Sequence, residues 1–199
     1  MSCHSQIISD TNKDRNIETV ISPSFYPMIG MPDTVRTWIV PLTLMVFFFF
    51  LPLQCFIIGN DQGLGIQGAV YRYQITGNGI SLIPVTHEIS YITNGFYHGK
   101  TAVSVILWVA GTLVLGCTVL LSLLFTNRIN PALFQLTIVG ITSSCILYLV
   151  SLVFHYGVFF SGPAGVSLPA GILIMALFAV FLYNNENIFL NKNRIPVAD

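Results

Sequence analysis

The sequence predicts an all-α membrane protein: a four-transmembrane-helix bundle with a small extracytoplasmic β-hairpin insert between helices 1 and 2. Three observations support this fold class. Only 8% of the 199 residues are charged and 54% are hydrophobic, whereas a soluble domain has about 25% charged residues. Four long apolar stretches contain no Asp, Glu, Lys or Arg. A further stretch alternates apolar and polar residues with the period of a β-strand.

The N-terminal segment differs in composition from the rest of the chain. Residues 1–36 contain many Ser, Asp, Asn and Pro residues and few apolar anchors, so we expect a cytoplasmic tail, followed by a membrane domain over residues 37–199. The first apolar stretch is too long for the core of a cleavable signal peptide, and no A-x-A-like site follows it. We therefore expect it to remain as a signal-anchor helix.

Four stretches pass the length test for a transmembrane helix, which needs roughly 20 mostly apolar residues. They are residues 37–59, 101–125, 131–155 and 165–183, of which the last is the weakest. Pro131 suits the first position of a helix and follows a short connection. The second and third spans should therefore form an antiparallel hairpin in a multi-pass protein.

The positions of Lys and Arg predict the topology, because these residues are enriched in cytoplasmic segments. Six of them fall in the N-terminal tail, in the connection between the second and third spans, or after the fourth span: Lys13, Arg15, Arg36, Arg128, Lys192 and Arg194. These segments should lie on one side of the membrane. Two, Arg72 and Lys100, fall on the opposite side. Both termini should then be cytoplasmic, with residues 60–100 and 156–164 extracytoplasmic.

The insert at residues 60–100 has a β-hairpin pattern. Asn78-Gly79 is a strong signal for a two-residue turn. Alternation holds on both sides of it, with Tyr71, Tyr73 and Ile75 on one parity before the turn and Ile83, Val85, Ile89 and Tyr91 on one parity after it. An isolated hairpin is marginal in water. We therefore expect its apolar face to pack on the outer end of its own helix bundle, beside an apolar loop at residues 156–168.

Small residues on the second and third spans predict close helix packing. Thr112 and Gly116 form one small-xxx-small pair, and Gly140 and Ser144 form another. Such pairs let helix backbones approach closely in a membrane. Packing within the bundle is favoured over contact between copies.

Chemistry inside the membrane finds little support in the sequence. The spans lack ionisable carboxylates and amines, which are costly in lipid and mark functional sites there, and the chain has no C-x-x-C pair. We expect no catalytic residues and no cofactor. His87, His98 and His155 should lie in one outer layer and form a candidate Zn or Cu site, although no diagnostic spacing supports it.

The function predicted from these features is non-enzymatic. The chain would be an accessory or scaffold subunit whose outer β-like cap contacts another membrane protein or another copy of itself, through Tyr71, Arg72, Tyr73 and Tyr91. Zero net charge and the absence of a basic cluster argue against nucleic acid as a partner. One alternative is a small oligomeric channel or transporter lined by Thr112, Thr142, Ser143 and Gln135. Another is a metal-binding enzyme at the outer face, and a third is a cap that only stabilises the bundle.

Overall fold

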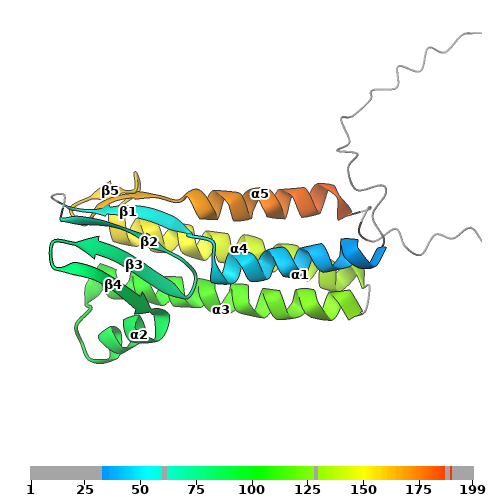
Figure 1. Ribbon diagram of the computed structural model, residues 1–199, viewed down its shortest axis with the longest axis horizontal. Helices are drawn as coiled ribbons and strands as arrows, with labels where there is room; N and C mark the ends of the chain where they lie inside the picture. The colour runs from blue at the N-terminus through cyan, green and yellow to red at the C-terminus, as the bar shows by residue number, and fades with distance from the viewer. Residues whose placement is uncertain (1–32, 60–61, 128–129, 187–188, 190–199) are drawn as a thin grey trace, which may run out of the picture. The chain divides into compact units, whose positions relative to one another are not determined.

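The computed structural model describes residues 33–59, 62–127, 130–186 and 189, and these form five α-helices and a six-stranded antiparallel sheet (Figure 1). The helices are α1 (Asp33–Phe49), α2 (Val85–Thr93), α3 (Gly99–Asn127), α4 (Pro131–Tyr156) and α5 (Ala170–Asn184). The strands are β1 (Gln54–Ile58), β2 (Gly63–Gln67), β3 (Tyr71–Thr76), β4 (Gly79–Pro84), β5 (Ser161–Gly162) and β6 (Gly165–Leu168). Most of the predicted tail, residues 1–32, lies outside the described residues.

The prediction of an all-α bundle of four membrane-spanning helices is wrong. Among the described residues, only α3 and α4 are long and apolar enough to cross a membrane. Helix α1 has 17 residues and α5 has 15, which falls short of the roughly 20 that a span requires. A multi-pass protein with four spans is therefore not supported.

The error arose because two predicted spans each combine a helix with a strand. The stretch 37–59 contains most of α1 and all of β1, and the stretch 165–183 contains β6 and most of α5. A short apolar strand cannot be distinguished from a helix segment by composition alone. Pro52 and Pro169 mark both boundaries, since the residue before a proline is biased away from helical geometry.

The predicted hairpin of α3 and α4 is confirmed. Asn130 caps α4, because its side-chain oxygen accepts a hydrogen bond from the Ala132 amide at 2.9 Å, and Pro131 occupies the first turn. Near the other end of the hairpin, Ser104 and Ser151 each donate to the carbonyl oxygen of the other, at 2.9 and 2.8 Å. Both serines are buried, so these bonds lock the two helices together.

Gly140 lies where α4 packs tightly against Thr118 of α3, and it gives a testable prediction. A Cβ atom at this position would lie 2.1 Å from Thr118 Oγ1. We expect Gly140→Ala to lower the free energy of unfolding by about 1–3 kcal/mol, the usual cost of overpacking. The matched control is Gly116→Ala, whose Cβ would meet Phe48 at 3.4 Å, an ordinary contact. Thermal unfolding in detergent measures both, and equal midpoints for the two variants would contradict the prediction.

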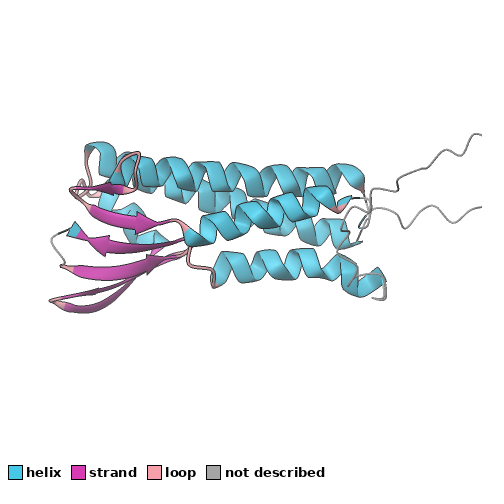
Figure 2. Ribbon diagram, turned by 90° about the horizontal axis from the view of Figure 1, so that it is seen from above, coloured by secondary structure: helices cyan, strands magenta, loops and turns pink. Residues whose placement is uncertain are grey.

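The sheet has the strand order β4-β3-β2-β1-β6-β5 and lies at one end of the α3–α4 hairpin, with its strands along the direction of the helices (Figures 1 and 2). The predicted β3–β4 hairpin is confirmed. Its two turn residues are Gly77 and Asn78 rather than Asn78 and Gly79, because Thr76 pairs with Gly79.

Two other predictions for this end of the molecule are wrong. The second strand ends at Pro84, and residues 85–93 form α2 rather than continuing the strand to Tyr91. Val85, Ile89 and Ile92 fit helical spacing as well as they fit part of a strand. Residues 156–168 are not a loop on the bundle, since they contain β5 and β6, and β6 pairs with β1 from Cys55–Leu168 to Ile58–Gly165.

Candidate functional site

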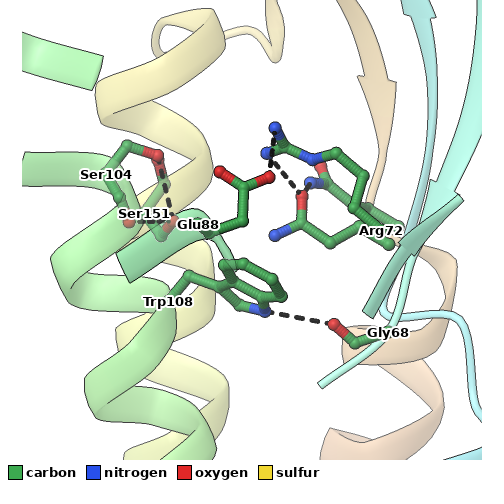
Figure 3. A network of polar contacts seen from close by, with 8 residues as sticks. Gly68, Arg72, Glu88, Ser104, Trp108 and Ser151 are labelled. Carbon is green, nitrogen blue, oxygen red and sulfur yellow. Dashed lines mark hydrogen bonds and ion pairs between the residues drawn. The ribbon is translucent and has the colours of Figure 1, made fainter. Parts of the chain in front are cut away.

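The two faces of the sheet differ in chemistry, and the polar face is the one turned toward the helices. Alternate residues of a strand point to opposite faces, so the register assigns each side chain to one of them. Gln54 of β1 pairs with Gln67 of β2, which pairs with Arg72 of β3. Trp108 of α3 reaches the same region, where its Nε1 donates to the Gly68 carbonyl at 3.1 Å (Figure 3).

A chain of polar contacts crosses this inner face from β6 to α2. Ser167 Oγ donates to Gln54 Oε1, and Gln54 Nε2 donates to Gln67 Oε1. The guanidinium of Arg72 donates from Nη2 to the same Gln67 oxygen at 3.2 Å. Its Nη1 forms an ion pair with Glu88 Oε1 at 2.9 Å. Four strands and one helix therefore each supply one member of a single buried network.

The ion pair at the end of this network is almost fully removed from solvent. The side chain of Arg72 is 14% exposed and that of Glu88 is 0% exposed. The guanidinium carbon lies 5.8 Å from the ring centroid of Phe56 and 6.0 Å from that of Trp108, within the range of cation–π attraction. Beyond the ion pair, neither Glu88 oxygen has a hydrogen-bond partner among the described residues. The charge of Glu88 is therefore balanced chiefly by Arg72.

The pKa of Tyr97 is affected by its burial near the ion pair. Burial, followed by the negative charge of Glu88, raises the pKa of the Tyr97 hydroxyl to about 12. Both effects disfavour the phenolate anion. Tyr97 thus stays neutral at physiological pH, in a region where Arg72 and Glu88 are the fixed charges.

The space beneath the network does not suit a substrate. A cavity of about 10 Å³ lies between Gln54, Gln67, Trp108 and Tyr148. That volume holds about one water molecule, whereas small-molecule pockets occupy about 300–1,000 Å³. The polar side chains of the inner face therefore form a structural network rather than a ligand site.

Most of the outer face of the sheet is formed by two rows of residues without a charge. The first row runs across five strands through Leu168, Cys55, Ile66, Tyr73 and Leu82. The second runs through Val166, Ile57, Leu64, Ile75 and Ile80. We call these ten residues the apolar sheet face. Leu64 is 58%, Leu82 66% and Ile80 68% exposed, so little in the described chain covers this face.

This arrangement reverses the predicted packing of the insert. The expectation was that the apolar face of the insert would lie on the helix bundle. That face points away, and the face bearing Arg72 lies inward. The physical reason is that the polar inner side chains find partners in one another and in Glu88, so their burial leaves few groups unsatisfied.

The four predicted contact residues do not share one surface. Tyr73 belongs to the apolar sheet face, and Tyr71 has the same parity in β3 and donates to the Phe50 carbonyl at 3.4 Å. Arg72 lies on the inner face in the ion pair. Tyr91 is on α2, where its ring packs against Phe96, Tyr97 and His87. Their role in partner binding stays a prediction, and Arg72 is poorly placed for it.

The predicted helix-packing residues lie at contacts within the chain. Gly140 faces Thr118, and Gly116 lies near Phe48. Thr112 donates to the Ala69 carbonyl at 2.7 Å, which joins α3 to the sheet. Ser144 is fully buried and donates to the Gly140 carbonyl at 2.9 Å.

The residues of the channel alternative are engaged in bonds or half-buried. Thr142 donates to the Ile138 carbonyl of its own helix at 2.9 Å, and Gln135 donates to Glu186 at 3.2 Å. Ser143 is half-buried. Thr112 has its hydroxyl on Ala69, as described above. No observation brings these four side chains together as a pore lining.

The predicted metal ligands are His87 on α2, His98 just before α3 and His155 near the end of α4. Across the described residues, no group of three or more His, Cys, Asp or Glu side chains is arranged to hold a metal ion. His155 instead packs on the ring of Tyr156, with ring centroids 4.6 Å apart.

Sequence reasoning missed the members of the polar network. Gln54 falls in the stretch 37–59 that was predicted as a membrane span, and Gln67, Trp108 and Ser167 were not identified. One signal was present: Arg72 and Glu88 are two of only four charged residues between positions 60 and 100. Opposite charges in so apolar a chain tend to pair when they are buried.

Comparison with known proteins adds no further guide to the site. No protein-family model matches this chain, and no curated protein matches it.

Proposed function

We propose that this chain is a membrane protein whose sheet makes protein contacts outside the bilayer, as an accessory or scaffold subunit. Helices α3 and α4 are long and apolar enough to span a membrane. In their most apolar windows, only 44% and 39% of residues are buried within the chain. The exposed residues of these two helices include apolar side chains such as Leu113, Leu120 and Val139. Lipid would remove this surface from water, which the hydrophobic effect favours.

The distribution of Lys and Arg supports an orientation for this membrane protein. The sheet lies at one end of the α3–α4 hairpin, and the start of α1 and the end of α5 lie at the other end (Figure 1). In the sequence, six of the eight Lys and Arg residues lie before residue 37, between α3 and α4, or after α5. Cytoplasmic termini with residues 60–100 and 156–164 extracytoplasmic, the orientation that the positive-inside rule favours, would also require α1 and α5, which are shorter than a usual span, to cross the bilayer beside the α3–α4 hairpin.

The apolar sheet face is the observation on which the proposed function depends. Soluble proteins rarely expose contiguous apolar patches larger than about 300–600 Å², and larger ones commonly mark interaction sites. If the sheet served only to stabilise the helices, its polar face would be expected outward and its apolar face inward. The observed orientation leaves the apolar side for a partner.

Photo-crosslinking tests this proposal directly. A photoreactive amino acid is placed at Leu82, which is 66% exposed on the apolar sheet face, and the control position is Phe96, which is 72% exposed in the loop before α3. After illumination of intact membranes, we expect a protein adduct from position 82 and far less from position 96. Adducts with lipid alone at position 82, or equal protein capture at both positions, would refute the proposal.

A further inference from the structure

We propose that the partner on the apolar sheet face is a second copy of this chain, packed sheet against sheet about a two-fold axis. This inference rests on the proposed function, because it names the partner of the same surface. It follows from the chemistry of the face, its area and its direction relative to α3 and α4.

The chemistry of the face makes it complementary to itself. None of its ten residues is charged, and nine of them are aliphatic or carry only a thiol; Tyr73 has the one hydroxyl. Packing against a charged surface would desolvate that surface without offering a counter-charge. A two-fold axis brings the same patch of both subunits together, so a second copy supplies an uncharged apolar surface of matching shape.

The area of the face is sufficient for a stable dimer. Its seven exposed aliphatic side chains, Ile57, Leu64, Ile75, Ile80, Leu82, Val166 and Leu168, are each 40–68% exposed. Together they leave on the order of 700 Å² open, close to the roughly 800 Å² that each partner contributes to a standard interface. Two sheets pack face to face at about 10 Å, with their strands aligned within about 30°.

The direction of the face favours a second copy over the bilayer surface. The strands run along the same direction as α3 and α4 in both views (Figures 1 and 2). If these helices cross the bilayer, the apolar sheet face stands upright on the membrane and cannot lie flat on it. A second copy inserted in the same bilayer presents its own face at the same height. The two-fold axis then runs along the membrane normal.

This symmetry predicts which residues meet. The two rows occupy β4, β3, β2, β1 and β6, so β2 is the central strand. With the axis passing beside β2, Leu64 faces the partner subunit's Leu64. Ile80 is on the outermost strand and faces the partner subunit's Val166. Four strand spacings of about 4.8 Å separate Ile80 from the partner subunit's Ile80, which is about 19 Å.

Cysteine crosslinking in membranes tests this arrangement. Cys3, Cys55 and Cys117 are replaced by Ser, while the buried Cys145 stays. Leu64→Cys and Ile80→Cys are then compared in two co-expressed, differently tagged copies treated with an oxidant or a short bismaleimide. We expect Leu64→Cys to give a product of two chains carrying both tags. The Ile80→Cys variant is the matched control, because Ile80 lies in the same row and has a similar exposed fraction. It should give several-fold less of the crosslinked dimer.

Three outcomes would overturn the inference, and they separate it from the proposed function. Equal dimer yields from the two cysteines would indicate random collision rather than the predicted register. If neither variant gives a dimer, and a photo-crosslinker at Leu82 captures a protein of different sequence, the second copy is excluded while the proposed function stands. If position 82 captures no protein at all, both are wrong. An unchanged thermal midpoint for each variant shows that the fold is intact.

Discussion

Glu88→Ala should destabilise the protein by about 3–5 kcal/mol, because removing one partner of a buried ion pair leaves the other charge uncompensated. The Arg72 side chain is 14% exposed, and its guanidinium lies near the rings of Phe56 and Trp108. Its remaining side-chain hydrogen bond, to Gln67 at 3.2 Å, offers no negative charge. Arg72 would have to leave the inner face to regain water, and it would disrupt the network as it did so.

A second variant separates the loss of charge balance from the loss of packing. The double variant Arg72→Met, Glu88→Leu removes both charges and keeps similar side-chain volumes. It should recover most of the stability that Glu88→Ala loses, since buried pairs replaced by apolar residues are often neutral in stability. The control is Glu186→Ala, which loses only an exposed contact with Gln135 and should cost less than about 1 kcal/mol.

Unfolding in detergent by denaturant, followed by tryptophan fluorescence, measures these effects. Trp108 lies beside the ion pair and reports its surroundings (Figure 3). A loss below about 1 kcal/mol for Glu88→Ala would show that Arg72 reaches solvent or another counter-ion, and that the network is not the element that holds α2 on the sheet.

The sequence predicts the α3–α4 hairpin well because its signals are local and consistent. Each helix is a long uncharged apolar run, and Asn130 and Pro131 mark the start of α4. The strands β1 and β6 could not be predicted in the same way. Each is a few apolar residues beside a short apolar helix, and the pairing of Cys55 with Leu168 joins positions far apart in the chain.

The local sequence pattern also does not predict which face of the sheet is turned toward the helices. The alternation of Tyr71 and Tyr73 with Arg72 correctly separates the two faces of β3, but it does not say which face is turned inward. That depends on polar partners distant in sequence: Ser167 and Gln54 are 113 positions apart. Once the network ends in the Arg72–Glu88 ion pair, most polar side chains of this face have partners in the interior. The apolar face is then left uncovered, so the structural network and the candidate interaction surface have a common cause.

Gly171→Ala should cost about 3 kcal/mol or more, because α5 begins against the backbone that leads into β1. A Cβ atom at position 171 would lie 2.0 Å from the Pro52 carbonyl oxygen and 2.8 Å from Leu53 Cα. These are backbone atoms, so no rotamer change relieves the clash, and overpacking reaches the upper end of its usual cost. To make room, α5 must move away from β1.

Such a movement would break the link between α5 and the sheet. The amides of Gly171 and Ile172 both donate to the Leu53 carbonyl, at 3.1 and 3.2 Å. Because β6 immediately precedes α5 and pairs with β1, the displacement should also weaken the sheet near Leu168. We therefore expect Gly171→Ala to lower the thermal midpoint and to increase hydrogen exchange at the β1 and β6 amides.

The control for this substitution is Gly77→Ala in the β3–β4 turn, where an added Cβ meets nothing within 4 Å. It should change stability by less than about 1 kcal/mol. If both variants unfold at the same temperature, with equal exchange in β1 and β6, the close approach of α5 to Pro52 does not contribute to the fold. A loss of stability and of exchange protection in Gly171→Ala alone would establish that the start of α5 holds β1 and β6 in register. The residues that these two strands contribute to the apolar sheet face would then depend on the same contact.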